Sequence, residues 1–339
     1  MQFMAKRRDI IVIGSSAGGV FALQQLVASL PRNFEASIFI VQHISPNSTS
    51  FLPEILSKSG NLKAVHPKDG ELIRQGCTYI APPDCHMLIE GDKILVKKGP
   101  KENRFRPSID ALFRSAAYNY GPRVIGVVLT GMLDDGTSGM WSIKRLGGLG
   151  VVQEPDDAQY SAMPSSVLEY VDVDYVVPIA GIADLLVELI QDDIKVAGTQ
   201  EAEAEKAELE RMKIEIDTAA QRNGFERGIM EIGDLTPLTC PECHGVLLRL
   251  KEGNLVRYRC HTGHSYSVTS LLEGLVESVE MKLYDALKSL EETVLLLEES
   301  AIEDEENGDV PVAQNLIEKA EIARKRAIKL REFIFEQAI

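Results

Sequence analysis

Short apolar segments rich in β-branched residues recur between residues 9 and 192, and helical patterns fall between them. The apolar segments cover residues 10–14, 37–43, 124–131, 150–153 and 173–178. The helical patterns include residues 20–30, 51–59, 109–119 and 137–147. Strands that are apolar on both faces belong to a mostly parallel sheet with helices on both faces. Residues 1–192 are therefore predicted to form an α/β domain.

Residues 72–98 depart from this pattern, because apolar and polar residues alternate between turns at Pro82–Pro83 and Gly91–Asp92. This alternation predicts an antiparallel hairpin that leaves the main sheet. Cys77 and Cys85 fall in the hairpin and are expected to be core or strand residues.

The composition changes after the α/β domain. Residues 193–235 are predicted to form an acidic helical linker that is mostly solvated, because they show little apolar face. A Cys/His-rich module follows at 236–268. Residues 269–339 contain two long helical patterns separated by DEENGDVP, which predicts an antiparallel helical hairpin.

The bulk composition narrows the class of protein. A formal charge of −15 disfavours nucleic-acid binding, which needs a net basic face. No run of about eighteen apolar residues is present, so no membrane insertion is expected. The short apolar run at 10–14 is better explained as a strand than as a signal peptide. Five cysteines with one Cys-x-x-Cys indicate a reducing cytoplasm and metal ligation, not a disulfide framework.

The turn after the first strand reads Gly-Ser-Ser-Ala-Gly-Gly over residues 14–19. It lacks the second glycine of a dinucleotide fingerprint, and the next strand ends at Gln42–His43, without the acidic residue that would bind a ribose. The turn does match G-x-S-x-G with Ser16 at its centre. Such a turn exposes a serine hydroxyl and leaves backbone N–H groups free for an oxyanion.

A nucleophilic serine needs a base, and the base needs a carboxylate. His43 ends the second strand and is better placed for this than His66 or His86. Asp134 and Asp135 follow the third apolar strand. Because the carboxyl ends of parallel strands meet at one edge of the sheet, these groups are expected to converge there. The order Ser, His, Asp differs from that of the α/β-hydrolases.

Four segments, IGSSAGG, FIVQH, RPSID and VVLTGMLDDGTSGM, together resemble the catalytic domain of bacterial chemotaxis protein-glutamate methylesterases. The resemblance covers about residues 9–190, in the order and spacing of the family. It implies a parallel α/β domain that hydrolyses γ-glutamyl methyl esters on chemoreceptor helices and often deamidates glutamines. It implies that catalysis needs no cofactor.

Mapped onto this sequence, the resemblance implies that Ser16 is the nucleophile, His43 the base and Asp135 the carboxylate. The backbone N–H of Met132 is implied as an oxyanion donor. The positions implied for the oxyanion and the substrate are Met132, Ala17, Arg106, Ser108 and Asp110.

Two departures from the family are visible. Many members have threonine where this chain has Ala17. The usual N-terminal receiver domain is expected to be absent, because the first esterase strand starts by residue 9. Activation by phosphorylation in cis is then not expected, and activity would be constitutive or controlled through the C-terminal half.

The segment 239–267 contains Cys240-x-x-Cys243 and, after sixteen intervening residues, Cys260 followed by His261 and His264. A hairpin turning at residues 252–254 would bring the two halves together as a small zinc ribbon with three sulfur ligands and one nitrogen ligand. His264 is preferred as the fourth ligand, because the Cys-x3-His spacing closes a turn, and His261 is the alternative. Four protein ligands imply a structural zinc ion. The segment also resembles zinc-ribbon-like tails of some methylesterase-like proteins.

Three functions are open from the sequence. The first is a cytoplasmic methylesterase acting on a methylated chemoreceptor or similar protein. The second is a regulatory scaffold that keeps the esterase-like domain for binding. The third is an esterase of the same fold with another substrate. The C-terminal helices are expected to pack within the chain or to form a homodimer, with coverage of the catalytic cleft as a further hypothesis.

Overall fold

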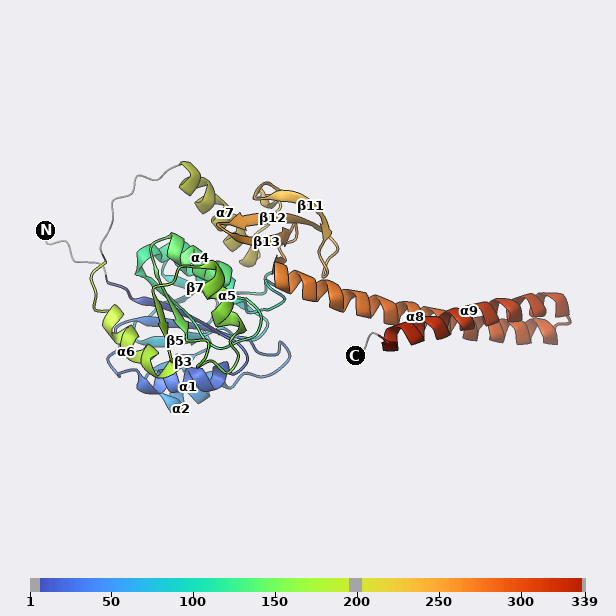
Figure 1. The fold of residues 1–339 in the computed structure, drawn as a ribbon, viewed down its shortest axis with the longest axis horizontal. Helices are drawn as coiled ribbons and strands as arrows, with labels where there is room; N and C mark the ends of the chain where they lie inside the picture. Colours follow the sequence, from blue (N-terminus) through green and yellow to red (C-terminus); the bar gives the residue numbers. More distant parts are fainter. Residues whose placement is uncertain (1–6, 195–202, 337–339) are drawn as a thin grey trace. The chain divides into compact units, whose positions relative to one another are not determined.

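The computed structural model describes residues 7–194 and 203–336, and Figure 1 shows its helices and strands. The chain divides into two compact units, Met1–Leu271 and Leu272–Ile339. The predicted segments 1–192, 193–235 and 236–268 all fall in the first unit, and the boundaries between them remain predictions. Part of the predicted linker, residues 195–202, lies outside the described residues.

A seven-stranded sheet lies at the centre of the first unit, and all of its neighbouring strands are parallel. Its order is β10-β9-β8-β1-β2-β5-β3. The strands are β1 (Ile10–Ser15), β2 (Ser37–Gln42), β3 (Lys63–Val65), β5 (Cys77–Ile80), β8 (Val124–Val128), β9 (Leu149–Gln153) and β10 (Tyr175–Val177). Every residue of β1, β2 and β8 is buried, as expected for strands covered on both faces. The predicted α/β class is confirmed.

Helices cover both faces of this sheet (Figure 1). They are α1 (Gly19–Ser29), α2 (Leu52–Ser59), α3 (Ile109–Tyr120), α4 (Thr137–Arg145), α5 (Ala162–Tyr170) and α6 (Ile179–Leu189), with a short 3-10 turn at Gly121–Arg123. Leu23 of α1 and Ile182 of α6 belong to the core on one face. Phe113 of α3 and Met163 of α5 belong to the core on the other face.

The hairpin predicted over 72–98 is only partly correct. Strands β4 (Glu71–Leu72), β6 (His86–Glu90) and β7 (Lys93–Lys97) form a separate antiparallel sheet. Strand β5, however, pairs in parallel with β2 and β3 in the main sheet. Its residues Thr78, Tyr79 and Ile80 are all buried, so this segment is a core strand and the alternating pattern was misleading.

Strand β1 lies between β2 and β8. The chain therefore moves to one side of β1 after the first crossover and later returns to the other side. Such a switch point opens a crevice at the carboxyl ends of the strands, where ligands bind in open α/β sheets.

The acidic segment after the α/β domain forms helix α7 (Glu203–Ala219). The prediction that it is mostly solvated is wrong for its second half, because Met212, Glu215 and Ile216 are at most 3% exposed. A four-stranded antiparallel sheet follows a 3-10 turn at Ile229–Glu231. Its strands are β11 (Asp234–Thr239), β12 (Val246–Glu252), β13 (Leu255–Cys260) and β14 (Ser265–Ser267). We call residues 234–267 the Cys/His module.

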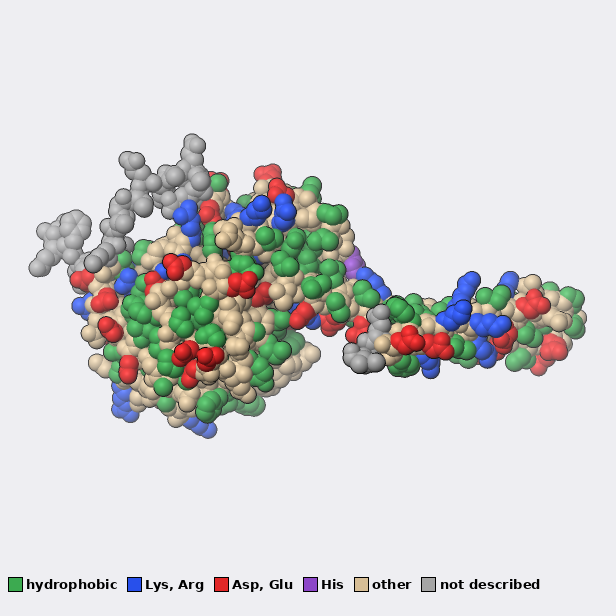
Figure 2. Space-filling model, viewed as in Figure 1, with side chains coloured by type: hydrophobic (Ala, Val, Ile, Leu, Met, Phe, Trp, Pro, Cys, Tyr) green, Lys and Arg blue, Asp and Glu red, His purple; other side chains and the backbone are tan. Residues whose placement is uncertain are grey.

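The second unit is a helical hairpin of α8 (Val268–Glu306, counted here from Leu272) and α9 (Val310–Glu336). Ion pairs from Arg324 to Glu298 and from Arg331 to Glu291 run between the helices in antiparallel register. Several hydrophobic side chains of the hairpin are exposed to solvent, including Leu295 and Leu296. Figure 2 shows hydrophobic patches between charged clusters along the hairpin. No helix in the described ranges is long and apolar enough to span a membrane.

Candidate active site

The turn after β1 separates the two adjacent serines. Ser15 is fully buried, and its hydroxyl donates to Gln42 Oε1 at 2.8 Å. Ser16 is only partly buried, and its backbone N–H donates to Thr130 O at 3.0 Å. Gly18 then adopts a φ of 76°, which a side chain would strain, and helix α1 starts at the next residue. The fold thus leaves Ser16 as the serine whose hydroxyl is available for chemistry.

His43 follows β2 and joins this serine to a carboxylate. Its Nδ1 lies 3.2 Å from Ser16 Oγ, and its Nε2 lies 2.9 Å from Asp135 Oδ2. The ring of Phe105 stacks on the imidazole with a centroid distance of 3.9 Å. Gln42 donates to the carbonyl oxygens of both Ser16 and His43. The imidazole is therefore held in one plane by contacts on several sides.

Asp135 lies behind the histidine and is 1% exposed. Besides His43, its oxygens accept hydrogen bonds from the backbone N–H of Ile109 at 2.7 Å, from Asn103 Nδ2 at 2.9 Å and from Ser108 Oγ at 3.0 Å. Burial by itself would raise the pKa of Asp135. The hydrogen bond and charge of His43, together with the other donors, outweigh burial and lower that pKa. Asp135 is thus a carboxylate at neutral pH.

Two predicted substrate-binding residues, Ser108 and Asp110, lie close to the triad but face its buried side. Both are at most 2% exposed. Asp110 Oδ1 accepts from the N–H groups of Gly136 and Gly139. Burial, and next the charge of Asp135, raise the pKa of Asp110. The structure places these residues as supports of Asp135, where a substrate cannot contact them.

Arg106, the third residue of that segment, turns away from the triad. Its guanidinium contacts Asp84 Oδ1 and donates to Gly99 O at 2.7 Å. His86 packs beneath the same segment, where it accepts from Ser108 N–H and contacts Pro100 O. Arg106 therefore bonds to residues before β6 and after β7, and its predicted position at the substrate site is not seen.

Met132, whose backbone N–H is the predicted oxyanion donor, and Ala17, predicted for the oxyanion or the substrate, flank Ser16. Among the described residues, no carbonyl or side chain accepts a hydrogen bond from either backbone N–H. The loop after β8 lies close to Ser16, since a Cβ at Gly131 would lie 2.9 Å from Ser16 Cβ and 2.1 Å from Met163 Sδ. The arrangement leaves two backbone donors available beside the serine.

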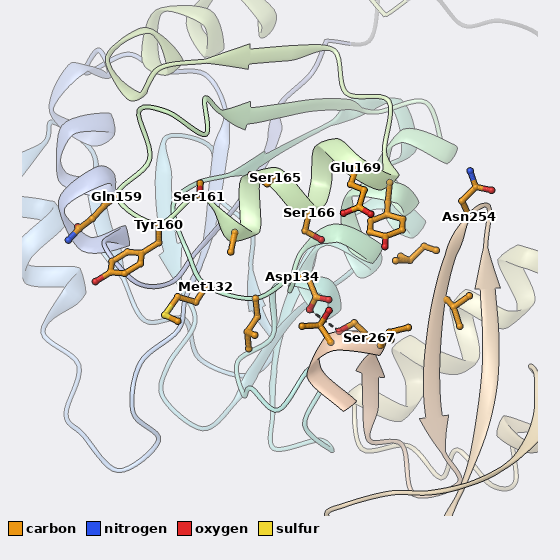
Figure 3. Close-up of a pocket in the computed structure, with 17 residues that line it drawn as sticks. Met132, Asp134, Gln159, Tyr160, Ser161, Ser165, Ser166, Glu169, Asn254 and Ser267 are labelled. Carbon is orange, nitrogen blue, oxygen red and sulfur yellow. Dashed lines mark hydrogen bonds between the residues drawn. The ribbon is translucent and has the colours of Figure 1, made fainter. Parts of the chain in front are cut away.

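A pocket of about 790 Å³ adjoins this loop (Figure 3). Met132, Leu133 and Asp134 form one part of its lining, and residues 159–170 form another. The opposite wall comes from the Cys/His module at 254–256 and from residues 267–269. Figure 3 shows the bond from Ser267 Oγ to Asp134 Oδ1, 2.8 Å long, at the bottom of this wall. The module is therefore part of the surface beside the triad.

Within the module, Cys240, Cys243, Cys260 and His264 converge, and their ligand atoms lie within 4.8 Å of one another. Cys243 Sγ is 3.6 Å from Cys260 Sγ, and His264 Nδ1 is 3.6 Å from Cys260 Sγ and 3.7 Å from Cys240 Sγ. A tetrahedral zinc ion with bonds of about 2.3 Å to sulfur requires ligand separations of about 3.8 Å. The donor set and spacing therefore fit zinc.

Neighbouring groups orient these four side chains. His264 Nε2 lies 3.5 Å from Glu242 Oε2, which favours the tautomer that leaves Nδ1 free to bind a metal. Thr262 Oγ1 and the hydroxyl of Tyr266 contact the sulfur atoms. The ring of His261 lies instead beside Gly245, outside the group. The hairpin predicted to turn at 252–254 is confirmed by the antiparallel pairing of β12 with β13.

Two residues next to His43 and Asp135 were not predicted from the sequence. Asn103 donates to both Asp110 and Asp135, and Phe105 covers the imidazole of His43. Both lie within three residues before the RPSID segment, so their proximity to a recognised motif was the available signal.

Comparison with known proteins supports one family. The pattern of the CheB methylesterase family matches residues 11–186. A putative protein-glutamate methylesterase/protein-glutamine glutaminase of Leptospira interrogans is 43% identical over 188 residues, covering 55% of this chain and 97% of that protein. A Thermotoga maritima protein-glutamate methylesterase/protein-glutamine glutaminase is 37% identical, and the chain spans 54% of its length.

A solved structure is also similar. The crystal structure of the Thermotoga maritima CheB methylesterase catalytic domain aligns with a TM-score of 0.52 and 37% identity. The alignment covers 54% of this chain and 98% of that chain.

Proposed function

Because the chain belongs to the CheB methylesterase family, we propose that it hydrolyses γ-glutamyl methyl esters of proteins with Ser16, His43 and Asp135 as its catalytic triad. The observation that supports this most strongly is the chain of two hydrogen bonds, 3.2 Å and 2.9 Å long, from Ser16 through His43 to Asp135. We propose a methylated chemoreceptor or a similar protein as the substrate.

The first step is acyl transfer to the enzyme. As the Ser16 Oγ–C bond forms, the hydroxyl proton moves to His43 Nδ1 and the carbonyl electrons move to the oxygen. The backbone N–H groups of Ala17 and Met132 stabilise this oxyanion. When the intermediate collapses, the methoxy group leaves with the proton from His43 as methanol. An acyl-enzyme ester on Ser16 remains.

The second step restores the enzyme. Water gives one proton to His43 Nδ1 and attacks the acyl carbonyl, and Ser16 Oγ leaves and takes that proton back. The product is a glutamic acid side chain, which gives its remaining proton to the solvent and becomes the carboxylate. With a glutamine side chain the same steps release ammonia in place of methanol, which accounts for a glutaminase side activity.

The carboxylate fixes the direction of proton transfer. Asp135 accepts from Nε2–H of His43, so Nδ1 is the unprotonated nitrogen that faces Ser16. The low pKa of Asp135 keeps it charged while the imidazolium forms.

We further propose a structural zinc ion on Cys240, Cys243, Cys260 and His264. When bound, the ion would hold the two ends of the Cys/His module together and leave no open position for chemistry. Free cysteines at all five positions are compatible with the cytoplasmic location that we propose.

The test is methanol release from methylated receptor membranes by the purified protein. Ser16→Ala should abolish release, and Ser15→Ala is the matched control because it changes the adjacent, buried hydroxyl. Unchanged release by Ser16→Ala together with a dead Ser15→Ala would show that the nucleophile is assigned wrongly.

A further inference from the structure

The Cys/His module is joined to the segment that precedes the RPSID motif. Strand β14 runs beside residues 101–103, where Ser265 N–H donates to Lys101 O at 3.2 Å and Asn103 N–H donates to Ser265 O at 2.7 Å. Residues of the module thus add a short strand next to the groups that support Asp135. Some 160 residues of sequence separate the two partners.

The side chain of Asn103 lies between the module and the triad. It is 2% exposed and adopts a φ of 50°, an uncommon value that asparagine tolerates. Its Oδ1 accepts from Ser267 N–H at 2.9 Å and from Ser270 Oγ at 3.3 Å. Its Nδ2 donates to Asp135 Oδ1 at 2.9 Å and to Asp110 Oδ2 at 2.8 Å. All four bonds of the amide are buried.

The module and the triad carboxylate fix this amide from opposite ends. A backbone N–H only donates, so Ser267 requires the amide oxygen on its side. The NH₂ group must then face Asp135 and Asp110, where it favours the charged form of the triad carboxylate. The charged Asp135 only accepts, so both sides require the same orientation, and Ser267 N–H holds the oxygen end of the amide while the NH₂ end meets the carboxylates.

A buried ionic cluster keeps the module in this place. Arg259 of β13 donates to Glu102 at 2.8 Å and to Glu215 of α7 at 2.9 Å, and Arg114 of α3 also pairs with Glu102. All four side chains are at most 1% exposed. Burial alone would raise the pKa of Glu102, but Arg114 and Arg259 lower it to about 2. Charges buried this deeply are stable only while every partner is present, so module, α7 and α/β domain pack as one body.

We propose that Asn103 is a positioning residue of the triad and that β14 of the Cys/His module holds its amide against Asp135, so that the reactivity of Ser16 depends on the docked module. The inference rests on the proposed function of the triad. It gives the module a role in catalysis although no module residue contacts His43 or Ser16 in the described structure.

The experiment measures how fast a fluorophosphonate probe labels Ser16 in the full-length protein, which requires the triad but no methylated substrate. Asn103→Leu, nearly equal in size, should lower the maximal labelling rate about ten- to a hundredfold, the usual effect of removing a group that orients a catalytic partner. The probe concentration at half-maximal rate should stay unchanged. Asn119→Leu is the matched control, because its amide bonds to Gly91 N–H, Ile89 O and Ser115 O, away from the triad.

A second variant tests the link to the module. Ser267→Pro removes the N–H that fixes the amide and should lower the labelling rate by a similar factor. In the Asn103→Leu background the same proline should have little further effect, since the amide is already gone. A loss that Ser267→Pro causes through Asp134 does not involve Asn103 and is present in both backgrounds, so the difference between the two proline effects measures the contribution through Asn103.

Thermal unfolding and near-ultraviolet circular dichroism of each variant identify those that are folded at the assay temperature. A full proline effect in both backgrounds, or labelling by Asn103→Leu at the rate of Asn119→Leu, would overturn the proposal and leave the triad intact. Absence of labelling in the unmodified protein would overturn the nucleophile assignment, and this inference with it.

Discussion

Replacing Asp135 by asparagine should almost abolish ester hydrolysis while changing the volume of the side chain very little. The carboxylate accepts from His43, Ile109, Asn103 and Ser108, all of which offer N–H or O–H groups. An amide NH₂ in either orientation must face at least one donor. Facing His43, it would favour the tautomer that carries the proton on Nδ1, and Ser16 would lose its base.

The expected size of the effect follows from that tautomer change. The corresponding substitution in a serine protease lowers kcat about 10⁴-fold, which at about 1.36 kcal/mol per tenfold is about 5 kcal/mol of transition-state stabilisation. The unpaired donors should also reduce the free energy of unfolding by about 1–3 kcal/mol. Both values are well above the error of the assays.

Methanol release from methylated receptor membranes measures the loss, and chemical denaturation measures the stability. Asp134→Asn is the matched control, because it changes the adjacent carboxylate, which bonds to Ser267 instead of His43. We expect the control to keep activity within a few-fold of the unmodified protein. Activity of Asp135→Asn within tenfold, or a greater loss in Asp134→Asn, would refute this reading of the triad.

Four further outcomes are expected. Gly131→Ala should lower kcat about 100-fold in steady-state methanol release, since the new Cβ must move about 1 Å from Ser16. In the control Gly70→Ala the new Cβ meets open space and only the backbone, at a φ of 78°, is strained, so this variant should lose stability but keep its kcat. Folding lowers the pKa of Glu102 from 4.5 to about 2, so its charge should stabilise the fold above pH 4.5 and lose this contribution as the pH falls toward 2. The free energy of unfolding, measured by denaturation at pH 7 and pH 3, should therefore differ less between the two pH values in Glu102→Gln than in the unmodified protein. Elemental analysis should give one zinc per chain and much less for Cys260→Ser, and a ratio near zero in the unmodified protein would contradict the zinc site. If the exposed hairpin face forms a homodimer, Leu296→Glu should shift the sedimentation coefficient from dimer to monomer, and a monomer before substitution would contradict the dimer.

The elements of the fold that were predicted best from the sequence are the strands that are buried along their whole length. Strands such as β1 and β2 are apolar at every position, so their class and their parallel pairing could be inferred without tertiary information. The same rule failed for β5, whose alternating neighbours suggested a hairpin. Its pairing with β2 depends on the path that the chain takes across the sheet, and a local pattern of apolar and polar residues does not encode this path.

The convergence of a serine, His43 and an aspartate could also be predicted from sequence, because each follows a strand of one parallel sheet, whereas the choice of Ser16 over Ser15 and of Asp135 over Asp134 came from the family resemblance. The support of Asp135 was not accessible in the same way. Asn103 acquires its role only when residues 265–270 fold back onto it. Glu215 likewise looked like part of a solvated acidic helix, because the arginines that pair with it lie on β13 and α3.

The central claim is that Ser16 attacks the substrate with His43 as its base. The most direct measurement is to label the full-length protein with a fluorophosphonate and to locate the adduct by fragment mass spectrometry. We expect one adduct, on Ser16. Ser15→Ala should give the same adduct, whereas Ser16→Ala and His43→Ala should give none. An adduct on Ser15, or labelling that persists in His43→Ala at the original rate, would contradict the account.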